Sequence, residues 1–445
     1  MAENGGRAVS GAGKSGLKLF TERKIDDGAG AYYRLHVPAI GMNEDGRIIA
    51  VVQDYTGGLM GQPEVKEWFG MAARCDFNMY AGAPTHGCIT KVKHILQLVP
   101  GTSGPFKRMK YPPTVIWSID DNMHFVDPLN QSYAYHGTRL PDGTLLEPGD
   151  NVEIEGPDGK MHVLWTDGAK YGAQLFDIAE NLRKVEVADT MLKGVAGLTC
   201  TTDRLSDHYR GVGVENVYTY PNSVIFEDYQ RWKNDRILRK DPKRLRVLWQ
   251  GGSSHLGDWF SIKPMLPDLC RQYPELLWQL WGAEFPSAWK GIPDHQFEFL
   301  PWVQYQSYKT VLSMMDYDFS VAPLLPNVFN EGKSAIKFYE SAAVPDPKPC
   351  LAANVPPYSD EMIDGETGLL YSSPAEFTEK FCLLAENPAL RKELGENAQQ
   401  WLKENRDYTV TTPGLVDWML ETRDKTTAGD KSALEDMLNE YLGDD

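Results

Sequence analysis

Two segments in the second half of the chain carry residue types that can bind a diphosphate. The first is WQGGSSHLGDW (residues 249–259), which directly follows an apolar run. Gly251 and Gly252 would let the backbone approach a ligand closely, and the amides of Ser253 and Ser254 would then face an anion. A Gly-Gly-Ser turn is equally typical of an ordinary strand–helix connection, so this segment alone does not decide between the two interpretations.

The second segment is NEGKSAIKFYESAA (residues 330–343), in which Lys333 and Ser334 are predicted to open a helix. On that helix Lys333, Lys337 and Glu340 share one face, because they are spaced at i, i+4 and i+7. Two ammonium groups at a helix N-terminus suit a diphosphate, and a carboxylate two turns along suits a diol such as ribose. The alternative is a solvated Lys/Glu face, which the apolar stretch that follows makes less favourable.

Other polar residues are weaker candidates for chemistry. Asp120 and Asp121 imitate a metal-binding acidic pair, but they are better interpreted as the end of a strand, where one of them orients an acceptor or caps the next helix. His136 and Arg34 lie in expected loops, and a structural role is the commoner one for a single His. The segment GAGKSG (residues 11–16) imitates a phosphate-binding P-loop, but its spacing fails and no strand precedes it.

The elements that we expect to position these residues are alternating strands and helices. The expected strands are residues 47–55, 114–121, 194–202, 216–222, 246–252, 276–283, 297–303, 318–324, 349–355 and 368–373. Helical patterns lie between them, for example at residues 263–273, 305–315 and 334–343. Near-continuous apolar strands that alternate with helices indicate an α/β protein with parallel sheets covered on both faces. In such sheets ligands bind at the carboxyl ends of the strands.

The pattern predicts two such sheets, one after the other, with a break near residues 241–243. We expect a disordered tail at residues 1–18, an N-terminal domain at 19–241, a C-terminal domain at 242–405, and C-terminal helices with an acidic tail at 406–445. Residues 143–168 interrupt the first domain and read as a β-hairpin that turns at Pro157-Asp158-Gly159.

Composition excludes several classes of protein. The net charge of the 445 residues is −17, which argues against a general electrostatic grip on nucleic acid. The six cysteines are widely spaced without a CxxC pair, as expected of buried thiols in a reducing compartment. No apolar run is long enough to span a bilayer, and the N-terminus has no signal-peptide pattern. These features predict a cytoplasmic protein with no membrane span.

The order of several segments resembles glycosyltransferase family 4, and in particular its bacterial and phage branch with an N..KS..K..E donor helix. The matching pieces span roughly residues 30 to 405: YYRLHVPA (32–39), VIWSIDDNM (115–123), VADTMLKGVAGLTCTTDRLSDHY (187–209), VYTYPNSV (217–224), VLWQGGSSHLGDW (247–259), FLPWVQYQSY (299–308), the donor helix, and MIDGETGLLYSSPAEF (362–377). The resemblance implies the GT-B fold, in which two Rossmann-like domains face each other across a cleft, with the hairpin as an insertion in the first.

The resemblance also implies roles for the two segments described above. Gly251, Gly252 and Ser253 would lie against the donor diphosphate or sugar, Trp302 and Val303 would border the nucleobase, Lys333, Ser334 and Lys337 would bind phosphates, and Glu340 would bind the ribose hydroxyls. The chain departs from the family in two respects. Gly332 stands where the family has the first Glu of its donor motif, with Glu331 beside it, and Ser254 and His255 stand near the usual Arg/Lys pair.

By the same resemblance, the expected reaction transfers a sugar from a nucleoside-diphosphate sugar, UDP- or GDP-linked, with retention of configuration. The expected catalytic residues are Asp121, His255 and Lys333, and neither a metal nor a cofactor is expected. The acceptor is a glycan, a lipid-linked molecule, a protein or modified DNA.

Two alternatives remain open: a phage-type DNA glycosyltransferase acting on a hydroxymethylated base, in host cytoplasm, and a non-catalytic nucleotide-sugar-binding protein. The acceptor, the sugar and the oligomeric state are not determined by the sequence.

Overall fold

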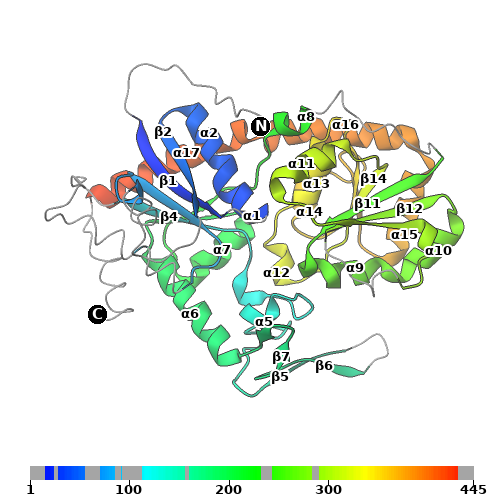
Figure 1. Cartoon of the computed structure of the whole chain (residues 1–445), viewed down its shortest axis with the longest axis horizontal. Helices are drawn as coiled ribbons and strands as arrows, with labels where there is room; N and C mark the ends of the chain where they lie inside the picture. Colours follow the sequence, from blue (N-terminus) through cyan, green and yellow to red (C-terminus); the bar gives the residue numbers. More distant parts are fainter. Residues whose placement is uncertain are drawn as a thin grey trace.

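The computed structural model describes residues 16–24, 29–55, 71–85, 92, 113–155, 160–231, 243–282 and 290–428. Several expected features lie outside these residues: most of the tail (1–15), the P-loop-like segment up to residue 15, the hairpin turn (157–159), the interdomain break at 241–242 and the acidic end (434–445). The described residues form two parallel sheets, one in each half of the chain (Figure 1).

The first sheet belongs to the N-terminal domain and has six parallel strands in the order β10-β9-β4-β3-β1-β2. The strands are β1 (Leu17–Lys24), β2 (Ile48–Tyr55), β3 (Phe77–Ala81), β4 (Thr114–Ile119), β9 (Gly197–Cys200) and β10 (Val217–Thr219). Every residue of β4 and β9 is buried, as expected of central strands in a covered parallel sheet. Sequence analysis missed β1 and β3, and β1 starts inside the expected tail because Leu17 pairs with Ile48.

Helices cover both faces of this sheet. They are α1 (Ala29–Ala31), the π-helical turn η1 (Tyr32–His36), α2 (Val37–Asp45), α6 (Ile178–Gly194) and α7 (Asp203–Val212). Asp177 caps α6 by accepting from the amide of Glu180, and Thr202 caps α7 by accepting from the amide of Leu205. Both caps fix where these helices begin, next to the carboxyl ends of the strands.

An insertion follows β4, as predicted. It comprises η2 (Met123–Phe125), α5 (Tyr133–His136), the antiparallel pair β5 (Asn151–Glu155) and β6 (Met161–Thr166), and the short pair β7 (Lys170–Tyr171) and β8 (Gln174–Leu175). It packs around Tyr133, Trp165 and Phe176, and Phe329 of the C-terminal domain joins the same cluster. The insertion therefore contacts both domains.

The second sheet also has six parallel strands, in the order β13-β12-β11-β14-β15-β16. They are β11 (Leu245–Gly251), β12 (Leu276–Gly282), β13 (Phe297–Pro301), β14 (Phe319–Ala322), β15 (Cys350–Ala353) and β16 (Leu369–Tyr371), and each overlaps an expected strand. The strand order reverses between β11 and β14. A crevice for ligands forms at such a point, outside the carboxyl ends of the strands.

The helices of the second half surround this sheet. They are α8 (Phe226–Gln230), η3 (Ser253–His255), α9 (Leu256–Ile262), η4 (Lys263–Met265), α10 (Leu266–Gln272), η6 (Asp294–Gln296), α11 (Tyr305–Met314), α12 (Val328–Glu331), α13 (Ile336–Ala343), α14 (Tyr358–Glu361), α15 (Pro374–Glu386) and α16 (Pro388–Asn405). Between β11 and α9, Trp259 packs in a tilted arrangement against Trp249 and edge to face against Trp278, with ring centroids 5.3 and 5.9 Å apart. This aromatic core supports the turn that follows β11.

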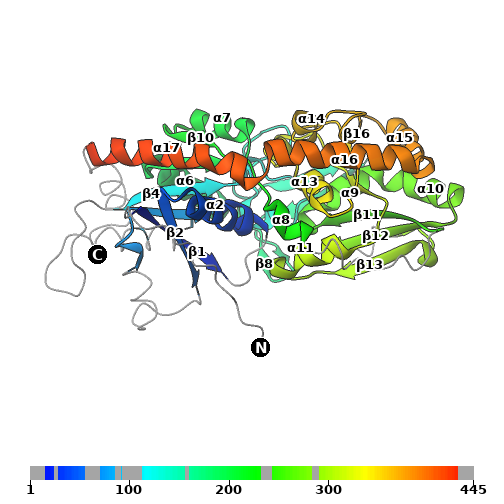
Figure 2. The same cartoon turned by 90° about the horizontal axis from the view of Figure 1, so that it is seen from above.

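The last described helix, α17 (Tyr408–Ala428), returns to the N-terminal domain, where Leu415, Val416 and Met419 are buried against β1 and α2. Figure 2 shows α16 and α17 running along one side of both domains. None of the described helices is long and apolar enough to cross a membrane. The five cysteines among the described residues are free thiols.

Candidate functional site

The turn at the end of β11 forms the floor of a cavity in the C-terminal domain. A side chain at Gly251 would bring its Cβ within 2.9 Å of the Trp249 ring. Gly282, at the end of the neighbouring strand, has a φ of +119°, and a Cβ there would lie 2.4 Å from the carbonyl oxygen of Gly251. Only glycine fits at either position, so the two strand ends expose backbone to the cavity.

This C-domain cavity has a volume of about 170 Å³. It is lined by Gln250, Gly251, Gly252, His255, Trp281, Gly282, Trp302, Val303, Tyr308, Ile336, Lys337 and Glu340. The rings of Trp281 and Tyr308 stack with centroids 4.6 Å apart, and the side chain of Trp302 is 62% exposed. An exposed aromatic face beside buried charges suits a ligand with a flat ring and a polar tail.

At this cavity, three polar side chains form a hydrogen-bonded series that runs from Lys337 through His255 to Asp258. Its Nζ lies 3.2 Å from Nε2 of His255, and Nδ1 of His255 lies 2.8 Å from Oδ2 of Asp258. Because the carboxylate accepts, Nδ1 of His255 carries its proton, and Nε2 accepts from the ammonium group. Asp258 is itself held by the amide of Leu325 at 2.8 Å and by Asn330 at 3.0 Å. These hydrogen bonds thus fix the position of one buried cation, the ammonium group of Lys337.

Burial strongly influences the protonation states of these three side chains. Burial, together with Lys337 and Lys333, lowers the pKa of His255 to about 3, so its imidazole is neutral at physiological pH. Burial and the nearby Lys333 lower the pKa of Lys337 to about 8. Burial alone would raise the pKa of Asp258, but its hydrogen bond with His255 and the adjacent cations hold it below its ordinary value. A bound anion would find a preorganised, incompletely neutralised ammonium group here.

Glu340 lies one helical turn beyond Lys337 and accepts three hydrogen bonds. Its Oε2 accepts from Gln250 at 2.9 Å and from Tyr308 at 2.8 Å, and its Oε1 accepts from Tyr33 at 2.7 Å. Tyr33 comes from the N-terminal domain, so this carboxyl group joins the two domains. Burial raises the pKa of Glu340 to about 7, against the opposing effect of the three donors.

A second, interdomain cavity of about 190 Å³ lies beside the first and shares His255, Ile336 and Lys337 with it. Its remaining lining residues are Gly30, Tyr33, Asp120, Asp121 and Asn222 from the N-terminal domain and Ser254, Leu324, Lys333, Ser334 and Tyr358 from the C-terminal domain. Asn222 donates to Oγ of Ser334 at 2.9 Å, which ties the domains together at the edge of the cavity.

Asp120 faces this cavity from the end of β4. Burial and the neighbouring Asp121 raise the pKa of Asp120 to about 6, although Arg34 and Lys333 oppose the shift. Arg34 is fully buried and donates to Ser118, Thr199, Asn222 and the carbonyl of Tyr220. It is therefore a structural residue beneath the acidic pair. Within the described ranges, no group of three His, Cys, Asp or Glu side chains could hold a metal ion.

Apart from Ser253, whose side chain lies outside the described part, every residue predicted for donor binding or catalysis lines one of these two cavities, whereas Arg34 lines neither. One local expectation is wrong: Lys333 and Ser334 do not open the helix. α12 ends at Glu331, Ala335 has a non-helical ψ of +43°, and α13 begins at Ile336. Lys333 therefore projects from a turn, with its Nζ 4.6 Å from the centroid of the Phe329 ring. His136, which was weighed as a cleft residue, lines a different cavity.

Gly332 takes part in the contact between domains. Its carbonyl oxygen accepts from Thr201 at 3.3 Å and from Thr202 at 3.2 Å. Its φ is −81°, and a Cβ there would make only ordinary contacts, the nearest at 3.5 Å, so the backbone does not require glycine. The adjacent Glu331 points toward Arg204, whose Nη1 is 4.0 Å from its Oε2. Glu331 does not line either cavity and does not replace the missing acid.

Several residues that line the cavities or orient their side chains were not singled out in the sequence. Gln250, Trp281 and Tyr308 belong to the C-domain cavity, Asp258 orients His255, and Tyr33 crosses from the other domain. Gln250 and Trp281 have a recognisable signal, because each directly precedes the glycine that ends its strand. Nothing in the sequence pairs Tyr33 with Glu340, since they are 307 residues apart.

Comparison of the sequence with protein-family models and with curated proteins finds no match. Solved structures do match in fold. The complex of Anabaena HepE with UDP-glucose is 12% identical, covers 91% of this chain and 100% of that chain, and has a TM-score of 0.55. Sucrose-phosphate synthase from Thermosynechococcus elongatus is 11% identical, with 93% and 100% covered and a TM-score of 0.56.

A glycosyltransferase from Rickettsia africae is 9% identical, with 92% and 99% covered and a TM-score of 0.55. At these identities the likeness concerns the fold. Two parallel six-stranded sheets with a cavity between their domains confirm the predicted architecture. The chain shares the fold of these structures, in which two Rossmann-like domains have the GT-B arrangement.

Proposed function

We propose that this chain is a glycosyltransferase that moves a sugar from a nucleoside-diphosphate sugar to an acceptor hydroxyl. The observation that carries the proposal is the hydrogen-bonded chain Asp258–His255–Lys337, which presents one buried cation between an aromatic cavity and the interdomain cavity. A nucleotide has the matching order of groups: a flat base, a diol and a diphosphate. The GT-B fold of the chain supports the same function.

In the proposed donor complex the base lies against Trp302 and Val303, and the ribose hydroxyls bind Glu340. The diphosphate lies over the Gly251–Gly252 turn, where Lys337 donates to it. Lys333 and Ser334 approach it from the interdomain side, because they line that cavity together with Lys337. The sugar then occupies the interdomain cavity, beside Asp121.

The reaction breaks the bond between the anomeric carbon and the diphosphate oxygen, whose electron pair leaves with the nucleoside diphosphate. Lys337 and Lys333 stabilise the negative charge that develops on this leaving group. The acceptor oxygen forms the new bond, and its proton passes to the departing phosphate, so retention needs no obligatory protein base or metal. His255 is neutral and acts by holding Lys337 in place. Asp121 orients the acceptor.

A uridine nucleotide is the first donor to test, since the Anabaena HepE structures contain UDP and UDP-glucose. The experiment measures thermal stabilisation by UDP-, GDP- and TDP-sugars for the wild type, Lys337→Met and Glu340→Gln. Both substitutions keep the size of the side chain. We expect each to weaken binding of the best donor by about 10- to 100-fold, the effect of losing a charged hydrogen bond.

Lys392→Ala is the matched control, because Lys392 is 76% exposed on α16 and does not line either cavity. It should bind the donor as the wild type does. If Lys337→Met and Glu340→Gln also bind the donor normally, the assignment of this donor site is wrong.

A non-catalytic nucleotide-sugar-binding protein is the second candidate, and Gly332 favours it. This glycine replaces the first acid of the family motif, and neither its position nor Glu331 supplies a carboxylate to the cavity. Release of free nucleotide from bound donor separates the two functions. Turnover in the wild type that disappears in Lys337→Met supports the transferase, whereas tight binding without any turnover supports the binding protein.

A further inference from the structure

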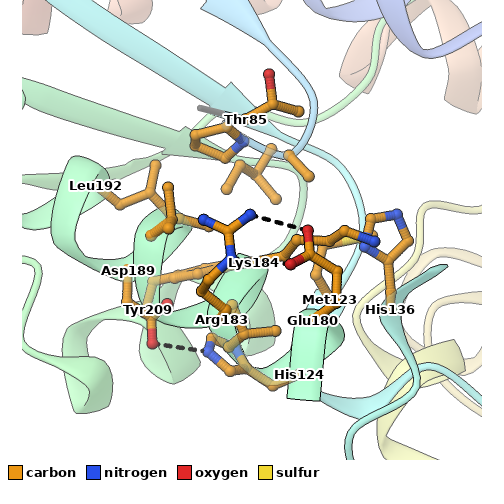
Figure 3. A pocket seen from close by; sticks show the side chains of 16 residues that line it. Thr85, Met123, His124, His136, Glu180, Arg183, Lys184, Asp189, Leu192 and Tyr209 are labelled. Carbon is orange, nitrogen blue, oxygen red and sulfur yellow. Dashed lines mark hydrogen bonds and ion pairs between the residues drawn. The ribbon is translucent and has the colours of Figure 1, made fainter. Parts of the chain in front are cut away.

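The cavities of this chain differ in whether their polar side chains already have partners. A third cavity, of about 240 Å³, lies in the N-terminal domain between the ends of β3 and β4 and the helix α6 (Figure 3). Four of its lining side chains form two pairs: Arg183 donates to Glu180 at 2.9 Å, and Asp189 lies 3.0 Å from His124. Polar groups that lack such partners are found instead in the interdomain cavity, and these can show what it binds.

Two carboxylates face the interdomain cavity from the N-terminal domain. Asp120 and Asp121 line it directly after β4, and no other described residue donates a hydrogen bond to either side chain. Arg34 lies near Asp120, but its hydrogen bonds go to four other residues. A carboxylate that is partly buried without donors is costly, and the hydroxyls of a ligand can supply the donors.

Gly30 leaves the room that one of these carboxylates occupies. A Cβ at Gly30 would lie 2.6 Å from Oδ2 of Asp120. Gly30 lines the same cavity, so the absence of a side chain keeps Asp120 next to the space in which a ligand would lie.

Tyr358 faces the interdomain cavity from the C-terminal domain. It opens α14, lines the cavity and is only 2% exposed. A buried tyrosine hydroxyl usually has a hydrogen-bond partner, but none of the described residues bonds to this one. Unlike the hydroxyl of Tyr317, it is not fully enclosed by protein, so its small accessible surface meets the cavity. A ligand there can supply the partner that this hydroxyl lacks.

The size of the cavity and these groups together match one sugar ring. The cavity, at about 190 Å³, has room for a six-membered ring with substituents, since a cavity of about 150 Å³ holds benzene. The two carboxylates accept hydrogen bonds only, whereas a phenol both donates and accepts. A sugar ring carries hydroxyls on several sides, so it can contact Asp120 and Tyr358 from opposite domains. Lys333 and Lys337 also line the cavity, but the proposed function assigns them to the diphosphate.

We propose that the interdomain cavity selects an uncharged hexose as the transferred sugar, and that Asp120 and Tyr358 are the residues that select it. Asp120 accepts from hydroxyls on one side of the ring, and the Tyr358 hydroxyl bonds to a hydroxyl on the other side. A uronic acid is rejected, because its carboxylate would lie in a small cavity beside Asp120 and Asp121. This assignment rests on the proposed function, in which the donor sugar occupies the interdomain cavity.

The first test compares UDP-glucose with UDP by isothermal titration calorimetry on the full chain, because the difference between the two isolates the contacts of the sugar. Tyr358→Phe should weaken UDP-glucose binding by about 3- to 10-fold, the effect of one lost hydrogen bond. Asp120→Asn should weaken it by at least about tenfold, because a charged acceptor is lost. UDP binding should not change in either variant. Tyr317→Phe is the matched control, since Tyr317 is equally buried but lines neither cavity, and it should bind both ligands as the wild type does.

The second test uses UDP-glucuronic acid, which carries a carboxylate where UDP-glucose has a hydroxymethyl group. The wild type should bind it at least about tenfold more weakly than UDP-glucose, because like charges repel at this distance. Asp120→Asn should narrow the difference, since one of the two repelling carboxylates is gone. Equal binding of both sugars to the wild type would overturn the proposed selection.

The UDP measurements separate this inference from the proposed function. If the wild type does not bind UDP at all, both are overturned. If UDP binds and UDP-glucose binds equally to the wild type, Tyr358→Phe and Asp120→Asn, the inference fails and the nucleotide site stands. Weaker UDP-glucose binding in both variants, with unchanged UDP binding, supports the inference.

Discussion

Replacing Tyr33 by Phe removes one hydroxyl and leaves its ring in place. The lost hydrogen bond is the 2.7 Å contact to Oε1 of Glu340, while Gln250 and Tyr308 still donate to Oε2. A hydrogen bond to a charged group contributes about 1.5–3 kcal/mol, and one pKa unit corresponds to about 1.4 kcal/mol. Because this bond stabilises the ionised carboxylate, its loss should raise the pKa of Glu340 from about 7 by roughly one to two units.

The sign of the pH effect follows from this pKa. Glu340 has a folded-state pKa of about 7, above its ordinary value of 4.5. Its protonated form therefore contributes fully to the free energy of unfolding below about pH 4.5, and this contribution is lost as the pH rises through 7. Binding of ribose hydroxyls requires the ionised form, which accepts hydrogen bonds only. UDP affinity should therefore increase as the pH rises through about 7 in the wild type, up to the pKa of about 8 at which Lys337 loses its proton. In Tyr33→Phe the increase near pH 7 should be absent, because the pKa of Glu340 lies roughly one to two units higher.

Isothermal titration calorimetry with UDP across roughly pH 6 to 8 measures the wild-type midpoint and its shift out of this range in Tyr33→Phe. Tyr408→Phe is the matched control, because it removes another tyrosine–glutamate hydrogen bond, the 2.8 Å contact to Glu44, away from both cavities. It should keep the wild-type midpoint. An unchanged midpoint in Tyr33→Phe would refute the assignment of Glu340 as a ribose-binding carboxylate tuned by the N-terminal domain.

Three further substitutions test other parts of the site. Asp258→Asn should weaken UDP binding by about 10- to 100-fold in calorimetry, because His255 loses its charged partner. Wild-type affinity in this variant would show that Asp258 and His255 do not position the ammonium group of Lys337. Gly332→Ala should raise the free energy of unfolding in urea by about 0.4–1 kcal/mol, because alanine tolerates its φ of −81°; a loss of stability would mean that a methyl group does not fit beside Leu205 and Asn122. Arg34→Met should lower that free energy by about 3–5 kcal/mol, because the four buried groups of Ser118, Thr199, Asn222 and Tyr220 that accept from Arg34 lose their donor; a loss below about 1 kcal/mol would contradict this account of the buried network.

Much of the fold follows from local sequence. The strands of the C-terminal domain are apolar runs between helical patterns, and all six overlap the expected segments. β1 and β3 were missed because neither shows such a run: LKLFTERK alternates with charged residues, and FNMYA is only five residues long. Their positions depend on pairing with neighbours that come later in the chain, such as Ile48 with Leu17.

The donor helix shows how tertiary contacts override a local pattern. The spacing of Lys333, Lys337 and Glu340 predicts one helical face, yet the helix begins only at Ile336. The carbonyl of Gly332 is held by two threonines of the other domain, and this contact shapes the turn from which Lys333 projects. The residues still meet at one site, because the turn and the helix line adjoining cavities.

The sequence by itself predicted the two-sheet architecture and the residues of the proposed donor site, because glycine turns after strands and lysines at helical spacing are local signals. The tertiary structure alone decided their partners. Asp258 holds His255, and Tyr33 binds Glu340 from the other domain. Such pairings depend on burial and on contacts between distant segments, which shift the pKa values and leave no periodic pattern in the chain.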